Sequence, residues 1–319
     1  MKRIAIIIPY FGQWPPWMEL YLYSCSRNPT IDILFFTDCP SPGDTEHVKF
    51  HSTTFDEYCK RAASLLNVRF APHRPYKLCD LRPFYGYLHR QELAGYDFWG
   101  FGDIDLVYGD LSGFVNDCAL DRYDILSTHA DRISGHFCLL RNNEANRNIG
   151  FRIKGWESLL ENEANVGMDE RHLSQVIVPE MKLVKIFYGR ILRRIFPIGT
   201  AFRIHNRAIV PLVRQICRQE HRRLYFREMD TTPEIWPARS MEYIYRNGCI
   251  FERKTGKERI YLHFLFFKKN PYRSCYLWNE QTPLTVPYPE KSVEHPLYID
   301  AQGIHYQHKQ KAKCERSFT

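Results

Sequence analysis

The run Ile4–Ile8 near the N-terminus is the feature that most constrains the fold. Four of its five residues are isoleucine and the fifth is alanine. A continuous apolar, β-branched run is typical of a strand that is covered on both faces of a parallel sheet. Pro9 and Gly12 interrupt the run and polar sequence follows, so we interpret it as a buried strand and not as a signal peptide. No window reaches 18 uncharged apolar residues, and no transmembrane span is expected.

Further strands and helices alternate along the chain. Apolar runs predict strands at 31–36, 97–101, 123–127, 136–140 and 260–267. Helical patterns cover 16–27, 55–67, 78–93 with an interruption near Pro83, 142–162 and 169–176. This alternation favours an α/β fold with a doubly wound mixed sheet, in which ligands bind at the carboxyl ends of the strands. The 319 residues contain no repeat or low-complexity linker, so we expect one elaborated domain instead of two.

The net charge of +8 is unevenly distributed. The segment 182–227, which we call the basic strip, holds twelve Lys or Arg and one acidic residue, so it carries +11 and the remainder carries −3. Its apolar residues at 183, 186, 187, 191 and 195 share one helical face, which is typical of a helix on an anionic membrane surface. A solvated basic helix and an oligomer contact are alternatives. No nucleic-acid-binding motif accompanies the charge, and we predict no nucleic-acid partner.

The ten cysteines occur singly, without a C-x-x-C pair. Such spacing favours a reduced protein over a disulfide scaffold or a zinc site. The cysteine pattern and the basic strip together predict a cytoplasmic protein that binds peripherally to the inner face of the cytoplasmic membrane.

Asp103 and Asp105 are the leading candidates for metal ligands. They follow the apolar strand 97–101 and are separated by Ile104. In an extended backbone, side chains two residues apart point the same way, so both carboxylates can face one ion. Mg²⁺ and Mn²⁺ prefer oxygen ligands, usually carboxylates together with substrate phosphates. A solvated turn is the alternative, but two carboxylates in apolar surroundings are costly unless a cation compensates them.

Two sequence blocks, Pro75–Pro83 and Gly95–Leu111, resemble the bacterial surface-polysaccharide glycosyltransferases of GT-A type. The resemblance covers roughly 1–175 and the 260s. It implies a GT-A (nucleotide-diphospho-sugar transferase) fold over 1–319, a nucleotide-sugar donor, with UDP as the expected nucleotide, and Mn²⁺ or Mg²⁺. In that arrangement 1–111 forms the nucleotide-binding half, 112–181 and 255–270 the acceptor and metal-completing half, and 182–227 a basic amphipathic elaboration. The resemblance does not specify which sugar is transferred.

The same resemblance assigns the donor contacts. Pro9, Tyr10 and Phe11 would lie against the base and ribose, and Thr37 and Asp38 would hydrogen-bond the uracil or ribose; alternatively, Asp38 caps a turn. Lys77, Asp80 and Arg82 would line the donor pocket, where Lys77 or Arg82 meets phosphate or sugar hydroxyls. Lys77 and Asp80 could equally form a surface ion pair one helical turn apart.

Three later segments complete the predicted site. His263 is the candidate third metal ligand, and Lys268, five residues on, would meet the diphosphate, as in glycogenin-like enzymes. The chain lacks the glycines and tryptophan that surround that lysine in those enzymes, and a partly buried strand histidine is the alternative. Ser134, Gly135 and His136 would contact the donor sugar, although His136 could simply start a strand.

Asp169 and Glu170 are candidates for the general base that an inverting transferase needs; alternatively, Asp169 caps the helix that follows and Glu170 favours its dipole. The predicted function is therefore metal-dependent transfer of a hexosyl unit to a glycan or lipid-linked acceptor in capsule or lipopolysaccharide-type synthesis. A metal-dependent nucleotidyltransferase is one alternative, but Pro9–Trp14 is not a Gly-rich phosphate loop. A non-enzymatic module that binds membranes or nucleic acid is the other.

Overall fold

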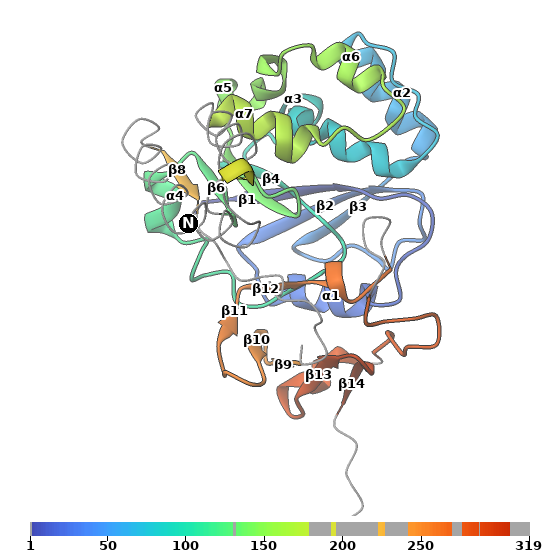
Figure 1. Cartoon of the computed structure of the whole chain (residues 1–319), viewed down its shortest axis with the longest axis vertical. Coiled ribbons are helices and arrows are strands. Elements are labelled where there is room, and N and C mark those ends of the chain that lie inside the picture. The colour runs from blue at the N-terminus through green and yellow to red at the C-terminus, as the bar shows by residue number, and fades with distance from the viewer. Residues whose placement is uncertain are drawn as a thin grey trace, which may run out of the picture. The chain divides into compact units, whose positions relative to one another are not determined.

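Two compact units make up the chain (Figure 1). The computed structural model describes residues 2–129, 132–178, 193–195, 223–226, 242–269, 276–286 and 288–306. The first unit comprises 1–14, 28–104 and 112–229, and the second comprises 15–27, 105–111 and 230–319. This division differs from the predicted single domain with a boundary at 111. The segments 15–27 and 105–111 join the C-terminal unit because their helix and strand pack on each other.

A seven-stranded sheet forms the centre of the first unit. The strand order is β3-β2-β1-β4-β7-β6-β8. The first four are mutually parallel, β7 is antiparallel to both β4 and β6, and β8 is parallel to β6. The fold is therefore of the mixed α/β class. The strand bounds are β1 Ile4–Pro9, β2 Ile31–Thr37, β3 Val48–Ser52, β4 Phe98–Gly102, β6 Ile125–Ser127, β7 Phe137–Arg141 and β8 Leu224–Phe226.

Helices of the first unit cover one face of this sheet (Figure 1). The covered face presents alternate strand residues, among them Ile7, Phe36 and Trp99, which pack with helical residues such as Leu81 and Phe84. These helices are α2 Phe55–Leu66, η1 Pro75–Phe84, α3 Tyr85–Leu88, α5 Glu144–Arg147, η2 Ile149–Arg152, α6 Trp156–Glu161, η3 Met168–His172 and α7 Leu173–Ile177. The unit also contains α4 Asp117–Arg122.

The segment predicted as an interrupted helix at 78–93 is instead a 3₁₀ helix, η1, followed by the single turn α3. Pro83 lies inside η1 and has no N–H to donate, which is incompatible with a regular α-helix at this point. The tighter 3₁₀ winding turns Lys77, Leu78, Asp80, Leu81 and Arg82 into the protein.

The second unit contains α1 Met18–Ser26, a two-stranded sheet and a five-stranded antiparallel sheet. β5 Leu106–Tyr108 pairs antiparallel with β12 Tyr261–His263. The larger sheet was not predicted; its order is β11-β10-β9-β13-β14, with β9 Tyr243–Arg246, β10 Cys249–Glu252, β11 Glu258–Arg259, β13 Leu297–Asp300 and β14 Gly303–Tyr306. A short 3₁₀ helix, η7 Pro289–Val293, precedes β13.

The strand predicted at 260–267 ends early, at His263. The next residues form a 3₁₀ turn, η6 Phe264–Phe266. Phe264 N–H donates to the Asp105 carbonyl at 2.9 Å, and the ring of Phe264 packs edge-on against Trp17 with centroids 5.3 Å apart. This packing bends the chain out of the strand.

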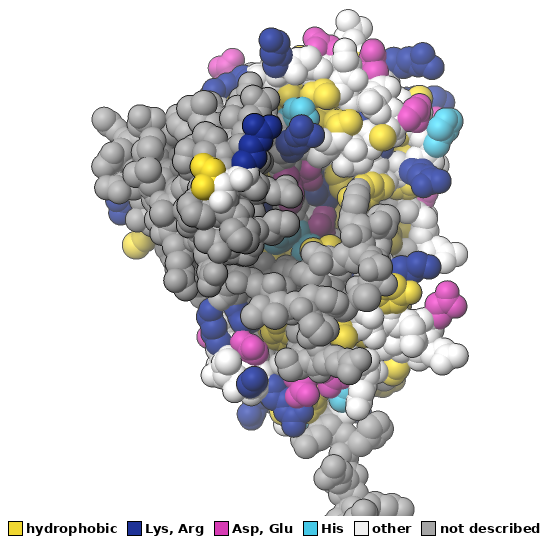
Figure 2. All heavy atoms as spheres, viewed as in Figure 1, with side chains coloured by type: hydrophobic (Ala, Val, Ile, Leu, Met, Phe, Trp, Pro, Cys, Tyr) yellow, Lys and Arg dark blue, Asp and Glu magenta, His cyan; other side chains and the backbone are white. Residues whose placement is uncertain are grey.

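Only residues 193–195 and 223–226 of the basic strip lie within the described part of the chain. They form α9 Arg193–Ile195 and β8. The proposed membrane-facing helix otherwise falls outside the described residues and stays a prediction. In Figure 2, the cationic side chains that are described are dispersed among acidic and polar ones. None of the helices that the structure describes is both long and apolar enough to span a bilayer.

The seven cysteines in the described ranges are free thiols: Cys25, Cys39, Cys59, Cys79, Cys118, Cys138 and Cys249.

Candidate functional site

The strand order of the first unit reverses at β1. The chain runs from β1 through β2 to the edge strand β3, and then crosses to the other side of β1 to form β4. The parallel register pairs Ile7 with Phe101, so β1 and β4 end side by side. Ligands of open α/β sheets bind outside the carboxyl ends of strands at such a reversal. The residues that follow β1 and β4 are therefore the first place to look for a site.

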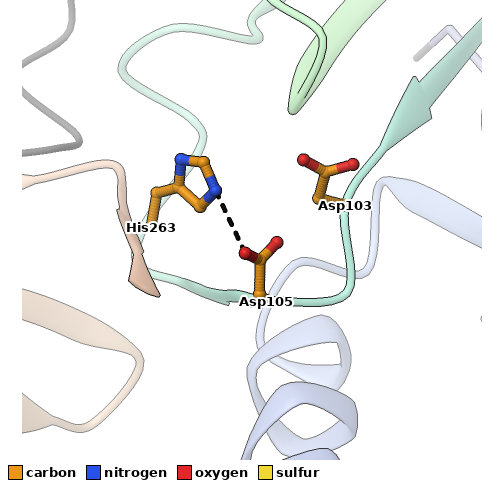
Figure 3. A group of neighbouring side chains, drawn as sticks. All are labelled: Asp103, Asp105 and His263. Atoms are coloured by element: carbon orange, nitrogen blue, oxygen red, sulfur yellow. Dashed lines mark hydrogen bonds and ion pairs between the residues drawn. The ribbon is translucent and has the colours of Figure 1, made fainter. Parts of the chain in front are cut away.

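Asp103, Asp105 and His263 form a cluster of side chains suited to a metal ion (Figure 3). Each offers one ligand atom, and these atoms all lie within 4.8 Å of one another. Two carboxylates and one imidazole suit Mn²⁺ well and also accept Mg²⁺ through oxygen. The predicted ligand set thus could hold a divalent cation.

Pairing of β5 with β12 brings His263 to Asp105. The register places His263 opposite Leu106, the residue after Asp105. His263 Nε2 then lies 3.2 Å from Asp105 Oδ2, and Lys268 Nζ lies 2.7 Å from the same oxygen. Burial alone would raise the pKa of Asp105, but His263 and Lys268 outweigh it and hold this pKa below its usual value.

Arg82 holds two acidic residues of the first unit. Its Nη1 donates to Asp169 Oδ2 at 2.7 Å and to the Gly135 carbonyl at 3.0 Å, and its Nη2 donates to Asp103 Oδ1. Burial alone would lower the pKa of Arg82, but the carboxylate of Asp103 and further neighbours raise it well above its usual value. Arg82 therefore binds two carboxylates in this structure, and its contact with phosphate or sugar stays a prediction.

Lys77 and Asp80 are buried, which contradicts the alternative of a surface ion pair; their place in the donor pocket stays a prediction. The three hydrogens of the Lys77 ammonium meet three acceptors: Asp80 Oδ2 at 2.9 Å and the carbonyls of Leu159 and Ala164 at 2.8 and 2.9 Å. The lysine is only 2% exposed and the aspartate is fully buried. Their ion pair is internal instead of superficial, and Lys77 has no hydrogen left for a phosphate.

Asp80 also holds the segment that leads to Asp169 and Glu170, which we call the acidic pair. Its Oδ2 accepts from Val166 N–H at 2.9 Å and its Oδ1 from Met168 N–H at 2.8 Å. Asp169 is the next residue. The function of Asp80 is thus to hold this loop, and no donor-pocket role follows from its position.

Asp169 and Glu170 lie in a π-helical turn, η3, whose N-cap is Gly167. The suggested N-cap role of Asp169 is therefore wrong. Its Oδ2 accepts from Arg82 and its Oδ1 from Glu170 N–H at 2.9 Å. Burial raises the pKa of Asp169 to about 6, although Arg82 opposes the rise.

Glu170 is more exposed than Asp169 and less constrained. Its Oε1 accepts from Gly135 N–H at 3.0 Å, and within the described part of the chain its Oε2 has no hydrogen-bond donor. Of the two acids, Glu170 is the one with a carboxylate oxygen available to a ligand.

The loop Ser134–His136 lies beside Asp103 because β7 is the neighbour of β4. Asp103 N–H donates to the His136 carbonyl at 3.2 Å. Gly135 binds Arg82 through its carbonyl and Glu170 through its N–H. Ser134 and His136 are buried, and His136 directly precedes β7.

The loop after β1 divides its aromatic residues between core and surface. Phe11 is 7% exposed and packs against Phe55 and Tyr58, and its contact with a base stays a prediction. Tyr10 and Trp14 are half-buried and stack with centroids 5.3 Å apart. Trp14 was not predicted, although it lies in the same loop; a search for every aromatic residue after the first strand would have found it.

Asp38 connects the loops that follow β1 and β2, and Thr37 forms a hydrogen bond within the second of these loops. Asp38 Oδ1 accepts from Gly12 N–H at 2.8 Å, and Thr37 Oγ1 accepts from Cys39 N–H at 3.0 Å. Asp38 is exposed and keeps its second carboxylate oxygen for a ligand, whereas Thr37 is buried. Pro9, at the end of β1, is half-buried.

The fold and these acidic residues define an α/β protein with a potential divalent-metal site. The chain belongs to a family of unknown function, DUF6625, whose model matches residues 6–208. No curated protein shows a significant match to it. Among solved structures, a crystal structure of an active-site mutant of LgtC aligns with 53% of this chain and 71% of its own, at 12% identity and a TM-score of 0.32. At that score, the alignment carries no argument about function.

Proposed function

We propose that the protein is a metal-dependent glycosyltransferase of GT-A type that transfers a hexosyl unit from a nucleotide-sugar, with UDP as the expected nucleotide. The cluster of Asp103, Asp105 and His263 is the observation that carries this proposal. It follows β4, next to the end of β1, where strand order reverses and where nucleotides bind in α/β sheets. Resemblance of the blocks around 75–83 and 95–111 to polysaccharide glycosyltransferases supports the same reaction.

The cluster would hold Mn²⁺ or Mg²⁺. Such a cation neutralises the charge that develops on a diphosphate leaving group. Lys268 would add a second positive charge for the diphosphate, because its ammonium lies beside Asp105 and is about one-third exposed. Arg82 would keep Asp103 in place through a buried ion pair.

Glu170 would face the reacting groups. Its Oε1 is oriented by Gly135 N–H, and its other oxygen is available as a hydrogen-bond acceptor. In an inverting reaction Glu170 would take the proton of the acceptor hydroxyl as that oxygen attacks the anomeric carbon. Asp169 would act through Arg82, as a positioning residue, because both of its oxygens are already engaged.

The loops after β1 and β2 would receive the nucleoside. Tyr10 and Trp14 provide aromatic surface, and the carboxylate of Asp38 can accept hydrogen bonds from ribose hydroxyls or a base N–H. A glycan or lipid-linked sugar is the proposed acceptor, in synthesis of a capsule or lipopolysaccharide-type polymer. The protein would work at the inner face of the cytoplasmic membrane, bound through the basic strip.

Hydrolysis of a panel of UDP-sugars with Mn²⁺ tests the catalytic proposal. We expect wild type to release UDP from one member of the panel and Asp105→Ala to lose at least roughly 10²-fold of this activity, the scale expected for loss of transition-state charge stabilisation. Turnover that is equal in the two proteins, or no binding of any nucleotide-sugar, would refute the proposal. Release of pyrophosphate from a nucleoside triphosphate would favour the nucleotidyltransferase alternative.

Co-sedimentation with anionic liposomes tests the membrane proposal. Neutralising Arg190, Arg193 and Arg194 should weaken binding, since each basic residue near an anionic surface contributes about 1 kcal/mol. Unchanged co-sedimentation of the triple variant would contradict a role for the basic strip.

A further inference from the structure

The ammonium of Lys268 and the imidazole of His263 contact the same carboxylate oxygen of Asp105. Lys268 Nζ lies 2.7 Å from Asp105 Oδ2, and His263 Nε2 lies 3.2 Å from it. The side chain of Asp105 is 9% exposed, that of His263 is 8% exposed and that of Lys268 is 33% exposed. The ammonium therefore lies, on the more open side, against the same carboxylate that the candidate metal site requires.

An ammonium and a divalent cation cannot both bind this carboxylate at little cost. Each is positively charged, and like charges repel strongly at such distances in a partly buried site. Asp105 would have to exchange the lysine for the metal, and the displaced ammonium would need another anion. A diphosphate bound to the metal supplies oxygen acceptors close by.

The structure gives Lys268 the freedom for such an exchange. Its backbone is fixed, because Lys268 N–H donates to the Phe264 carbonyl at 3.1 Å. Its side chain has a flexible four-carbon stem, and its Nζ lies 5.9 Å from the ring centroid of Trp17. The ammonium head can therefore move while the turn that carries it stays in place.

We propose that Lys268 competes with the divalent cation for Asp105, and that a diphosphate relieves this competition by binding the ammonium. Metal and diphosphate then bind cooperatively, and the metal alone binds weakly. The identity of the two ligands rests on the proposed function, whereas the competition itself rests on the shared carboxylate of Asp105. Lys268 is thus the residue that makes metal binding depend on a diphosphate.

Titration with Mn²⁺, followed by electron paramagnetic resonance of the free ion, tests this inference. The full chain is titrated alone, with UDP and with inorganic pyrophosphate, and the association of Mn²⁺ with each anion in buffer is measured separately. For wild type we expect UDP or pyrophosphate to tighten Mn²⁺ binding about tenfold or more, within the usual range of coupling between sites.

Lys268→Met removes the charge and keeps the length of the side chain. This variant should bind Mn²⁺ alone more tightly than wild type, and the diphosphate should tighten Mn²⁺ binding by a smaller factor than in wild type, because only the direct bond between metal and diphosphate then couples the two ligands. Tighter binding of the metal alone is the decisive result, because loss of a simple lysine–phosphate contact would not produce it. Lys269→Met is the matched control: Lys269 is the exposed next residue, and this variant should behave as wild type.

Three results would overturn the inference. Lys268→Met could keep the wild-type coupling, or it could bind Mn²⁺ alone no more tightly than wild type; in both cases the proposed function would stand. If wild type binds Mn²⁺ neither alone nor with UDP or pyrophosphate, the proposed metal site fails together with the inference.

Discussion

Gly135 has the least room of the residues around the acidic pair. A Cβ at this position would lie 2.8 Å from Asp169 Oδ2 and 3.1 Å from Glu170 Oε1. Asp169 is held by Arg82 and cannot yield freely. A glycine here lets the loop backbone approach both carboxylates and donate to one of them.

Gly135→Ala should therefore lower the rate of sugar transfer by roughly 10²-fold, the cost of misplacing a catalytic group by about 1 Å. Steady-state kinetics with the hydrolysed UDP-sugar, together with circular dichroism to confirm folding, provides the measurement. Gly113→Ala is the control, because nothing lies within 4 Å of its added Cβ. Equal activities for the two variants would show that Gly135 does not position the acids.

The raised pKa of Asp169 predicts how the stability of the protein depends on pH. Its pKa in the folded protein is raised to about 6 by burial, above the usual value of 3.8. A carboxyl group with a raised pKa stabilises the fold below its usual pKa, and this contribution is lost as the pH rises through the folded value. Between pH 4 and pH 7 the wild type should therefore lose stability relative to Asp169→Asn.

Urea denaturation of the two proteins at pH 4 and at pH 7 measures this difference. The difference in unfolding free energy between the two proteins should move in favour of Asp169→Asn as the pH rises. A difference that stays constant, or moves toward wild type, would mean that Arg82 compensates the buried carboxylate fully.

At the scale of single residues, sequence alone predicted the acidic side chains of the candidate metal cluster better than the contacts of the basic residues around it. Asp103 and Asp105 are visible as a pair because both follow one apolar strand. The two carbonyls that accept from Lys77 are 82 and 87 residues away, and Arg82 reaches Asp169 across 87 residues. No local pattern distinguishes such internal cations from cations that meet phosphate.

Among the elements, η1 and the loop before η3 are held together by one buried ion pair. Lys77 of η1 donates hydrogen bonds to two carbonyls near that loop. Asp80 accepts hydrogen bonds from the N–H groups of Val166 and Met168. This connection sets the position of Asp169 and Glu170 relative to β4.

Lys77→Met should lower the unfolding free energy by about 3–5 kcal/mol, because it leaves the Asp80 carboxylate buried without its cation. Lys60→Met is a matched control in an exposed ion pair with Asp56, whose side chains are 74% and 72% exposed, and it should cost less than about 1 kcal/mol. Chemical denaturation of both variants gives the comparison. Similar losses for the two would show that Lys77 contributes no more than a surface lysine.

The predicted elements that the structure confirms are those with a strong periodic or continuous pattern. They include β1, β2, β4, α1 and α2, with ends shifted by one or two residues. The strand β3 was missed because Val48–Ser52 carries lysine, histidine and serine at an edge. The strand β5 has only three residues, too few for a pattern.

At the scale of the whole molecule, the α/β class was predictable, and the division into two units was not. The second unit assembles from segments that are far apart in sequence, 15–27, 105–111 and the C-terminal region. Its strands are short, with two to four residues each. Long-range pairing of this kind leaves little trace in local sequence.

In the proposed mechanism, a metal ion joins His263 to the diphosphate of the donor. Electron–nuclear double resonance of Mn²⁺, bound together with UDP to protein labelled with ¹⁵N-histidine, measures both contacts. We expect a ¹⁵N coupling that disappears in His263→Gln, and a ³¹P coupling from UDP in the same wild-type sample. A wild-type spectrum without the ¹⁵N coupling, or one that His263→Gln leaves unchanged, would contradict it.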